Sequence, residues 1–228
     1  MTARVGVVLF PGTNCELDVE YAIRQLGGEA ELLWHGDDTT KGVDAVVVPG
    51  GFAHGDYLRT GALARFSPVM RAVGEHAQAG GPVVGICNGF QVLCEAHLLP
   101  GALQKNAGLK FLCETVELRV ETTSTALTSL AHAGDVLRVP INHFEGNYVC
   151  DERTLAELQA EGRVVFRYVR NPNGSLDDIA GICNAEGNVV GLMPHPERAS
   201  DPLLGSSDGV VLLKSLLAAG TSRATILV

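Results

Sequence analysis

Short hydrophobic runs in the first ninety residues alternate with amphipathic stretches. The run 5–10 is followed by a polar turn and by a helix-like stretch, 15–26, that ends at two glycines, and 61–79 is broadly helical. Further apolar runs cover 31–34, 43–48 and 82–86. Continuous apolar runs are typical of parallel strands buried on both faces. The alternation predicts an α/β fold with a mostly parallel, doubly wound (flavodoxin-like) sheet flanked by helices.

Beyond residue 110 the pattern changes to shorter apolar runs separated by polar turns. The strand candidates here are 111–120, 136–141, 164–169 and 189–193. Residues 210–217 form a closing helix. No linker rich in Pro, Gly or Ser separates this part from the first. We therefore expect additional short antiparallel strands within a single domain that spans 1–228.

Composition narrows the class of protein. With 46% hydrophobic residues and 27 glycines the chain has the make-up of a globular protein with many tight turns. It has no apolar stretch of the ~20 residues that cross a bilayer and no signal-peptide pattern, so we expect a cytoplasmic protein without a membrane partner. The net charge of -9 argues against a nucleic-acid partner, which clustered Lys and Arg would bind.

The six cysteines are expected to be free thiols in a reducing cytoplasm. They include no C-x-x-C pair, and the seven histidines are scattered rather than grouped at ligand spacing. We therefore expect no metal site.

One cysteine, Cys87, lies where the apolar run 82–86 breaks into Gly85-Ile86-Cys87-Asn88-Gly89 and becomes helical. A strand that turns sharply into a helix lifts the turn residue above the sheet edge, and the free N–H groups of the new helix favour a thiolate there. A buried core cysteine is the alternative on this segment alone. Cys15 is a rival nucleophile, but a four-residue turn separates it from the strand before it. We rank Cys87 first.

A thiolate nucleophile needs a base and a third group that orients the base. Pro194-His195-Pro196-Glu197 contains both types of residue. A proline favours an extended conformation in the residue before it, and residues i and i+2 of an extended chain point the same way. His195 and Glu197 are therefore predicted to lie side by side. A plain surface turn with two prolines is the alternative for this motif in isolation.

A tetrahedral intermediate also needs backbone donors for its oxyanion. The N–H of Asn88 is one candidate by position, and the turn around Gly50 and Gly51 at a neighbouring strand end supplies another. This glycine turn lacks the Lys-Ser/Thr of a P-loop, so nucleotide binding by this chain is not supported.

Cys, His and Glu in this order resemble the class I, or triad, glutamine amidotransferases. Two further motifs, Asn171-Pro172-Asn173-Gly174-Ser175 and the opening Pro11-Gly12-Thr13-Asn14-Cys15, narrow the resemblance to the family of glutaminase subunits of phosphoribosylformylglycinamidine synthase. The remaining matching motifs are Pro49-Gly50-Gly51-Phe52, Gly55-Asp56-Tyr57-Leu58-Arg59, Gly85 to Gln91, and Met193 to Arg198.

The resemblance implies roles for particular residues. Cys87 attacks the side-chain amide of glutamine, His195 protonates the departing ammonia and then activates water, and Glu197 orients His195. The oxyanion donors are Gly51 and Asn88. The residues implied to contact glutamine are Gly50, Gln91, His143, Phe144, Glu145 and Gly146. Phe144 is larger than the residue usual at its position in the family.

The resemblance also implies partners. Ammonia is passed to a large synthetase subunit that binds ATP and Mg²⁺, in a complex with a small third subunit, and this chain needs no cofactor of its own. Asp56 to Arg59 and Pro11 to Glu16 are candidates for the docking face, with a solvated loop as the alternative for each. Two other functions stay open: the same triad serving another synthase, or a silent binding subunit, which predicts a missing triad member.

Overall fold

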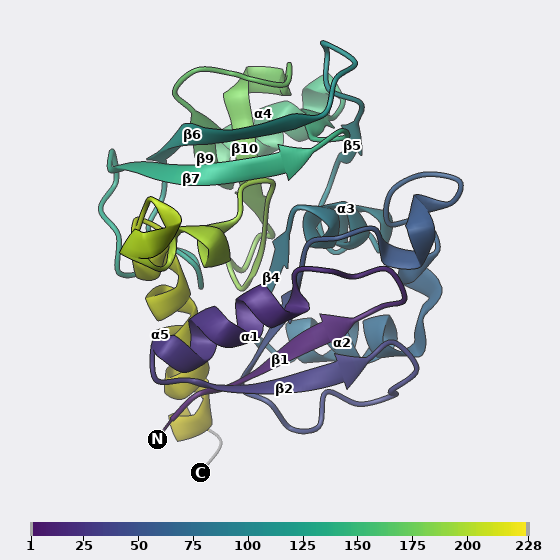
Figure 1. Ribbon diagram of the computed structural model, residues 1–228, viewed down its shortest axis with the longest axis vertical. Helices are drawn as coiled ribbons and strands as arrows, with labels where there is room; N and C mark the ends of the chain where they lie inside the picture. Colours follow the sequence, from purple (N-terminus) through teal and green to yellow (C-terminus); the bar gives the residue numbers. More distant parts are fainter. Residues whose placement is uncertain (1, 227–228) are drawn as a thin grey trace.

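The computed structural model describes residues 2–226, and their side chains as far as residue 222. Strands and helices alternate in the first half of the chain (Figure 1). In order they are β1 (Arg4–Leu9), α1 (Glu16–Gln25), β2 (Glu29–Trp34), β3 (Ala45–Val48), α2 (Pro68–Gln78), β4 (Val83–Ile86) and α3 (Asn88–Glu95). The strands pair in the order β2-β1-β3-β4, all in parallel, and β11 (Val189–Leu192) adds a fifth parallel strand beside β4. The predicted doubly wound sheet is confirmed.

The helices cover both faces of the parallel strands. The crossovers β1-α1-β2 and β3-α2-β4 run in opposite directions across the sheet, and because such crossovers are right-handed their helices lie on opposite faces. Figure 1 shows α1 in front of the strands and α2 behind them. Every side chain of β3 is therefore buried.

The helix expected over 61–79 begins later. Residues Ala64–Phe66 form a separate 3-10 turn, and Ser67 is extended (φ -63°, ψ 139°) before α2 starts at Pro68. Proline disfavours helical geometry in the residue before it and suits the first turn of a helix, which explains the break at this point.

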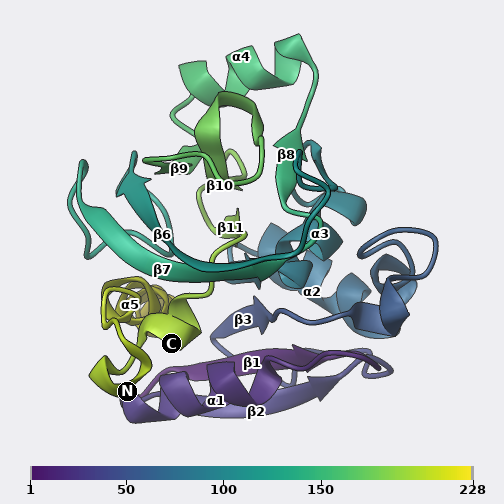
Figure 2. The ribbon, with the colours of Figure 1, turned by 45° about the horizontal axis from the view of Figure 1, so that its top comes forward.

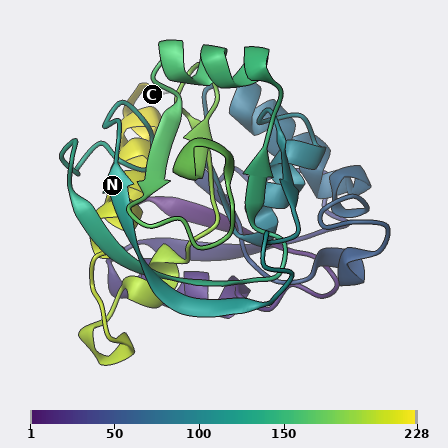
Figure 3. The same cartoon turned by 90° about the horizontal axis from the view of Figure 1, so that it is seen from above.

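The second half of the chain extends the same sheet with antiparallel strands. The order continues from β11 through β10, β9, β6 and β7, which gives nine strands in all. Three elements match the predicted runs: β6 (Leu112–Val120), β7 (Val136–His143) and β9 (Val164–Tyr168). Seen from above, β6 and β7 bend across the molecule (Figure 3). The predicted antiparallel strands are confirmed.

Four elements were not predicted. They are β5 (Ala102–Gln104), β8 (Asn147–Val149), α4 (Glu152–Ala160) and β10 (Ile179–Cys183). β5 and β8 form a separate two-stranded sheet, and α4 lies on the outer side of the antiparallel strands (Figure 2). The closing helix α5 runs over Val210–Ile226 and is longer than the stretch 210–217 that was predicted. No helix in the described range 2–226 is long and apolar enough to span a bilayer.

The first turn of α3 packs directly on the backbone of β3. A β-carbon on Gly89 would stand 1.8 Å from the carbonyl oxygen of Val48, far inside any allowed contact. On the other side of the turn, a β-carbon on Gly85 would stand 2.7 Å from the backbone of Gly89. The two glycines therefore set how closely α3 approaches the sheet.

This contact yields a stability prediction. Gly89→Ala should lower the free energy of unfolding by about 2 to 4 kcal/mol, because the added methyl group must displace either α3 or β3. Gly74→Ala in α2 is the matched control, since a β-carbon there has no neighbour within 4 Å. It should be neutral or stabilising by up to ~1 kcal/mol. Urea unfolding measures both, and equal midpoints for Gly89→Ala and the parent would disprove the close packing.

Candidate active site

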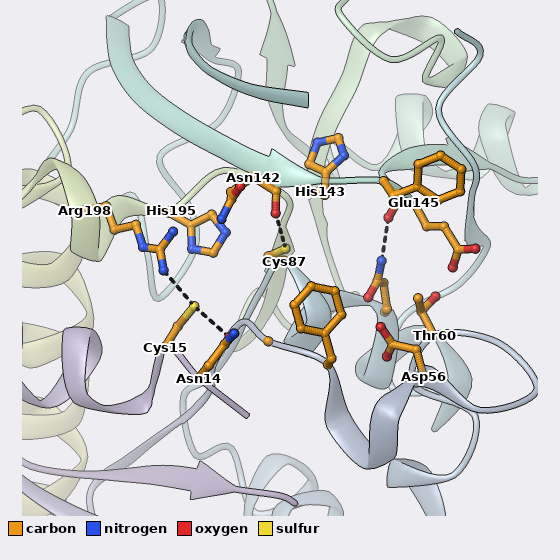
Figure 4. A pocket seen from close by; sticks show the side chains of 14 residues that line it. Asn14, Cys15, Asp56, Thr60, Cys87, Asn142, His143, Glu145, His195 and Arg198 are labelled. Carbon is orange, nitrogen blue, oxygen red and sulfur yellow. Dashed lines mark hydrogen bonds between the residues drawn. The ribbon is translucent and has the colours of Figure 1, made fainter. Parts of the chain in front are cut away.

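Cys87 lies in a sharp turn between β4 and α3. Its backbone has φ 52° and ψ -107°, a sparsely populated conformation that costs on the order of 1 to 3 kcal/mol in a non-glycine residue. The turn is held because the Cys87 N–H donates to the Leu192 carbonyl at 2.8 Å. The predicted strand-turn-helix elbow is confirmed, and the Cys87 side chain lines a cavity at the carboxyl edge of the sheet (Figure 4).

His195 and Glu197 follow β11 and form a buried pair. His195 Nδ1 lies 2.6 Å from Glu197 Oε1, and the His195 N–H donates to the Pro140 carbonyl of β7 at 2.9 Å. The predicted contact is present, and His195 is not helical (φ -106°, ψ 87°), as the proline after it predicts, but the chain does not stay extended as far as Glu197, because Pro196–Ala199 is a 3-10 turn. Pro196 suits the first position of such a turn, and the turn carries Glu197 back onto the imidazole.

The pair sets the charge state of the imidazole. Burial alone lowers the pKa of His195, but the Glu197 carboxylate and the Cys87 and Cys15 sulfurs outweigh it and hold the pKa well above its usual value. With Nδ1 engaged by Glu197, the other ring nitrogen, Nε2, is buried and, apart from the two sulfurs, has no hydrogen-bond partner among residues 2–226. His195 therefore presents one nitrogen to the cavity, ready to exchange a proton with a bound group.

Gly50 packs between the groups of this site. A β-carbon on Gly50 would stand 2.7 Å from His195 Cε1, 3.1 Å from Cys15 Sγ and 3.5 Å from Cys87 Cβ. These contacts place the imidazole and both thiols around one point of the β3 carboxyl end. The absence of a side chain at residue 50 is what allows them to converge.

Cys15 belongs to the same cavity rather than to a separate site. Arg198 Nη2 donates to Cys15 Sγ at 3.2 Å, and Arg198 Nε donates to Asp18 at 3.1 Å. Cys15 has an ordinary backbone (φ -108°) and precedes α1. Both cysteines therefore stand at the start of a helix, but only Cys87 is held in a strained strand-to-helix turn (φ 52°, ψ -107°), and this geometry favours Cys87 as the nucleophile.

Of the expected oxyanion donors, Asn88 directly follows Cys87, and Gly51 lines the same cavity as Cys87. Asn88 is the first residue of α3, and Gly51 (φ 143°) forms an isolated bridge with Thr13. Within the described part of the chain, no backbone carbonyl accepts from either N–H. A β-carbon on Gly51 would stand 2.7 Å from the Asn14 nitrogen, so only glycine fits this approach.

The residues expected to contact glutamine are brought together only in part. Gln91, His143, Phe144 and Glu145 line the cavity. Gly146 lies behind this wall, where its missing β-carbon would stand 2.2 Å from the ring of His143. The 143–146 turn thus forms one wall of the cavity.

The Gln91 amide is engaged at both ends. Its Oε1 accepts from Asn88 Nδ2 at 2.9 Å, and its Nε2 donates to the Glu145 carbonyl. Asn88 Oδ1 in turn accepts from the Ala53 N–H at 3.0 Å. Gln91 therefore supports the cavity wall as well as lining it.

The Asn171 to Ser175 motif supports the same wall from outside. Asn173 Nδ2 donates to the Gly146 carbonyl at 2.9 Å, and the Ser175 hydroxyl donates to the same oxygen at 3.2 Å. From the other side, Asn106 Oδ1 accepts from the Gly146 N–H at 3.1 Å and lies 3.0 Å from His143 Nδ1. Burial, together with the charge on His195, lowers the pKa of His143 to about 4, so this imidazole is a neutral part of the wall at pH 7.

The cavity has a volume of about 260 Å³. Besides Cys15, the rival nucleophile, six of its lining residues were not predicted as site residues: Asn14, Phe52, Asp56, Thr60, Asn142 and Arg198. Arg198 directly follows the His-Pro-Glu motif, and this position in the sequence could have identified it as a site residue. Asp56 was predicted to face a partner, yet its side chain lines the cavity. Asn142, whose carbonyl lies 3.8 Å from Cys87 Sγ, approaches only through tertiary packing.

The donor atoms of Cys15, His195 and Glu197 lie within 4.8 Å of one another, a spacing that a metal ion could use. In this structure these groups form hydrogen bonds with one another and with neighbouring side chains instead. Glu197 is bonded to the imidazole, and Arg198 donates to the Cys15 sulfur. A cation would have to displace the guanidinium, which argues for a proton-transfer site.

Comparison with known proteins places this geometry in a family. A family model described as the CobB/CobQ-like glutamine amidotransferase domain matches residues 2–207. A protein of Rubrobacter xylanophilus named phosphoribosylformylglycinamidine synthase subunit PurQ is 59% identical over 215 residues, which cover 94% of this chain and 98% of that one. A protein of the same name from Mycobacterium tuberculosis is 62% identical over 218 residues, covering 95% and 97%.

Two solved structures are similar to this chain. A chain in the structure of PurLQS from Thermotoga maritima superimposes with a TM-score of 0.88 at 41% identity, covering 96% of this chain and 99% of that one. A putative GMP synthase subunit from Thermoplasma acidophilum superimposes with a TM-score of 0.70 at 15% identity, covering 100% and 98%, and shows the fold alone.

The His195–Glu197 pair yields a titration prediction. Glu197→Gln should lower the pKa of His195, because the variant removes the anion that opposes burial while keeping the side chain's shape. Proton NMR titration of the histidine Cε1 resonances, assigned with His195→Asn, measures the change.

Glu161→Gln is the matched control, since Glu161 is exposed and pairs with Arg163. It should leave the His195 titration unchanged. A His195 pKa that is the same in Glu197→Gln and in the parent would show that Glu197 does not set the charge of the imidazole.

Proposed function

The chain belongs to the CobB/CobQ-like glutamine amidotransferase domain family, and from this membership we infer that it is the glutaminase subunit of phosphoribosylformylglycinamidine synthase. In this proposal it hydrolyses glutamine to glutamate and supplies ammonia to a synthetase subunit. The observation that carries it is the buried His195–Glu197 pair, at 2.6 Å, whose His195 lines the same cavity as Cys87. Relatives of that name at 59% and 62% identity support the choice of synthase.

The first step forms a bond between Cys87 Sγ and the side-chain carbonyl carbon of glutamine. The elbow holds the sulfur at the carboxyl edge of the sheet, where the dipole of α3 stabilises a thiolate. As the carbonyl becomes tetrahedral, its oxygen takes up negative charge. The N–H groups of Gly51 and Asn88 then donate to that oxygen.

His195 moves the protons in both halves of the reaction. The imidazolium gives its Nε2 proton to the amide nitrogen, the C–N bond breaks, and ammonia leaves a glutamyl thioester on Cys87. The neutral imidazole then takes a proton from water, whose oxygen attacks the thioester carbon. The C–S bond breaks, which regenerates the Cys87 thiolate and the His195 imidazolium, and glutamate leaves after its new carboxyl group has lost a proton to solvent. Glu197 keeps the Nδ1 proton in place throughout.

The ammonia must reach its acceptor without passing through bulk water, where protonation at neutral pH removes its nucleophilicity. We propose that the large synthetase subunit binds ATP, Mg²⁺ and formylglycinamide ribonucleotide and receives the ammonia directly, in a complex with a small third subunit. The product is formylglycinamidine ribonucleotide, an intermediate of purine synthesis. We place this reaction in the cytoplasm, which suits a chain whose six cysteines are all free.

The loop after β3 is the proposed docking face for the synthetase. Three apolar side chains of this loop, Phe52, Tyr57 and Leu58, are 50%, 73% and 87% exposed, and exposed apolar side chains that gather in one segment favour a protein–protein contact. Phe52 and Asp56 of the same loop line the cavity. A partner that binds this loop therefore contacts a segment that also forms the wall of the active site.

The nucleophile is tested by substitution in the assembled complex. Cys87→Ala should lower glutamine-dependent synthesis by about 10³-fold or more, because no thioester forms. Ammonia-dependent synthesis should be unchanged, because it bypasses the glutaminase. Both rates are measured by formation of the ribonucleotide product.

Cys15→Ala is the control, because Cys15 is the other thiol of the cavity. It should retain glutamine-dependent turnover. Survival of that turnover in Cys87→Ala together with its loss in Cys15→Ala would reverse the assignment of the nucleophile.

The docking face yields a separate prediction. Glutaminase activity of the isolated chain should rise when the synthetase subunit is added, and Tyr57→Ser should weaken this stimulation while leaving the isolated activity unchanged. Leu130→Ser, an exposed apolar residue (50%) that packs near α5, should leave the stimulation intact. Full stimulation of Tyr57→Ser at limiting synthetase would place the docking face elsewhere.

A further inference from the structure

The cavity has two chemically different ends. Cys15, His195 and Arg198 lie at one end, and Asp56, Thr60 and Glu145 lie at the other, with Cys87 between them (Figure 4). Glutamine carries its α-ammonium and α-carboxylate groups at the end remote from its amide. A glutamine whose amide lies between Cys87 and His195 therefore extends its α-carbon towards Asp56 and Glu145.

Asp56 is fixed towards the cavity by α3. Asn88 Nδ2 donates to Asp56 Oδ1 at 3.1 Å, and the same amide nitrogen donates to Gln91. Asn88 is itself tied to the loop through the Ala53 N–H. The residue directly after the nucleophile thus orients the Asp56 carboxylate, although 32 positions separate the two in the chain.

Among the described residues no cationic side chain lines this end of the cavity, although Lys105 Nζ lies 5.9 Å from the ring centroid of Phe144 in its wall. Asp56 and Glu145 are close enough that the Glu145 charge adds to burial in raising the pKa of Asp56 to about 6, against the opposing hydrogen bonds from Asn88 and Gly61. Among the lining residues of the described chain, Arg198 is the one lysine or arginine, and it lies at the far end and pairs with Asp18. The nearby Arg59 is bound by Glu95 at 2.6 Å.

The cavity also shows independently that it is built for a ligand. His195, which is 1% exposed, lines it, and apart from the Cys15 and Cys87 sulfurs beside the imidazole its Nε2 has no hydrogen-bond partner among residues 2–226. In folded proteins nearly all buried polar atoms have a hydrogen-bond partner. The Nε2 nitrogen at one end and the two carboxylates at the other match a ligand with an amide at one end and a cation at the other.

We propose that Asp56 binds the α-ammonium group of glutamine and makes the site selective for α-amino amides. The proposal rests on the glutaminase function above. Glu145 lies nearby, so a cation bound by Asp56 also relieves the repulsion between the two carboxylates. Asp56 therefore contributes to substrate recognition rather than to the chemical step, which Cys87 and His195 perform.

The test compares glutamine with glutaramate, which is glutamine without its α-amino group, in the assembled complex. Asp56→Asn keeps an oxygen for the Asn88 hydrogen bond and removes the charge. It should lower kcat/KM for glutamine about 10- to 100-fold, the effect of losing a charge-assisted hydrogen bond. The same variant should leave kcat/KM for glutaramate unchanged or raise it. If glutaramate is not turned over, its inhibition constant against glutamine gives the same comparison.

Asp38→Asn is the matched control, because Asp38 is an exposed aspartate outside this cavity. It should change neither substrate. Equal losses on glutamine and glutaramate in Asp56→Asn, together with weaker complex assembly on gel filtration, would assign Asp56 to docking and overturn the proposal. An unchanged preference for glutamine would overturn it as well. Failure of the unmodified complex to hydrolyse glutamine would instead refute the glutaminase function.

Discussion

The carbonyl oxygen of Val48 occupies the place where a side chain at residue 89 would begin, 1.8 Å from that position. Because Gly89 has no such side chain, α3 starts on top of the β3 backbone, and the turn before it must bend sharply enough to place Cys87 at φ 52°. The other parts of the site depend on this arrangement. Asn88 can reach both Asp56 and Gln91 only from the first turn of a helix that lies this close to β3.

The parallel half of the fold could be predicted from sequence because its strands are buried on both faces and read as continuous apolar runs. The missed elements carry weaker patterns. β5 and β8 have three residues each, and α4 buries only Leu158, so its hydrophobic face is barely visible. β10 is fully buried, but Gly181 interrupts a run of five residues. The Asp151 side chain, which caps α4 by accepting from Thr154 at 2.7 Å, was the one local signal for that helix.

Much of the site could be predicted because its chemistry is local in sequence. The residues from Gly85 to Gly89 predict the elbow on their own, and the His195–Glu197 contact joins residues two positions apart. The convergence of Cys15 with His195, through Gly50 and Arg198, depends on the docking of α1 against the turn after β11, which no local pattern encodes. The inward position of Asp56 has the same origin, because its partner Asn88 is on another element.

The Gln91 amide joins the two halves of the molecule. Its oxygen is held by Asn88 at the start of α3, in the parallel half, and its nitrogen is bound to the Glu145 carbonyl after β7, in the antiparallel half. A change in the distance between the two sides of the cavity therefore requires a change in the orientation of this amide. If the 143–146 turn moves and the hydrogen bond from Gln91 to the Glu145 carbonyl is kept, Gln91 must move with it, and Asn88, which follows Cys87, moves as well. Otherwise that hydrogen bond breaks, and the two halves separate at this point. This amide therefore connects the turn after β7, in the antiparallel strands, to Asn88, the neighbour of Cys87.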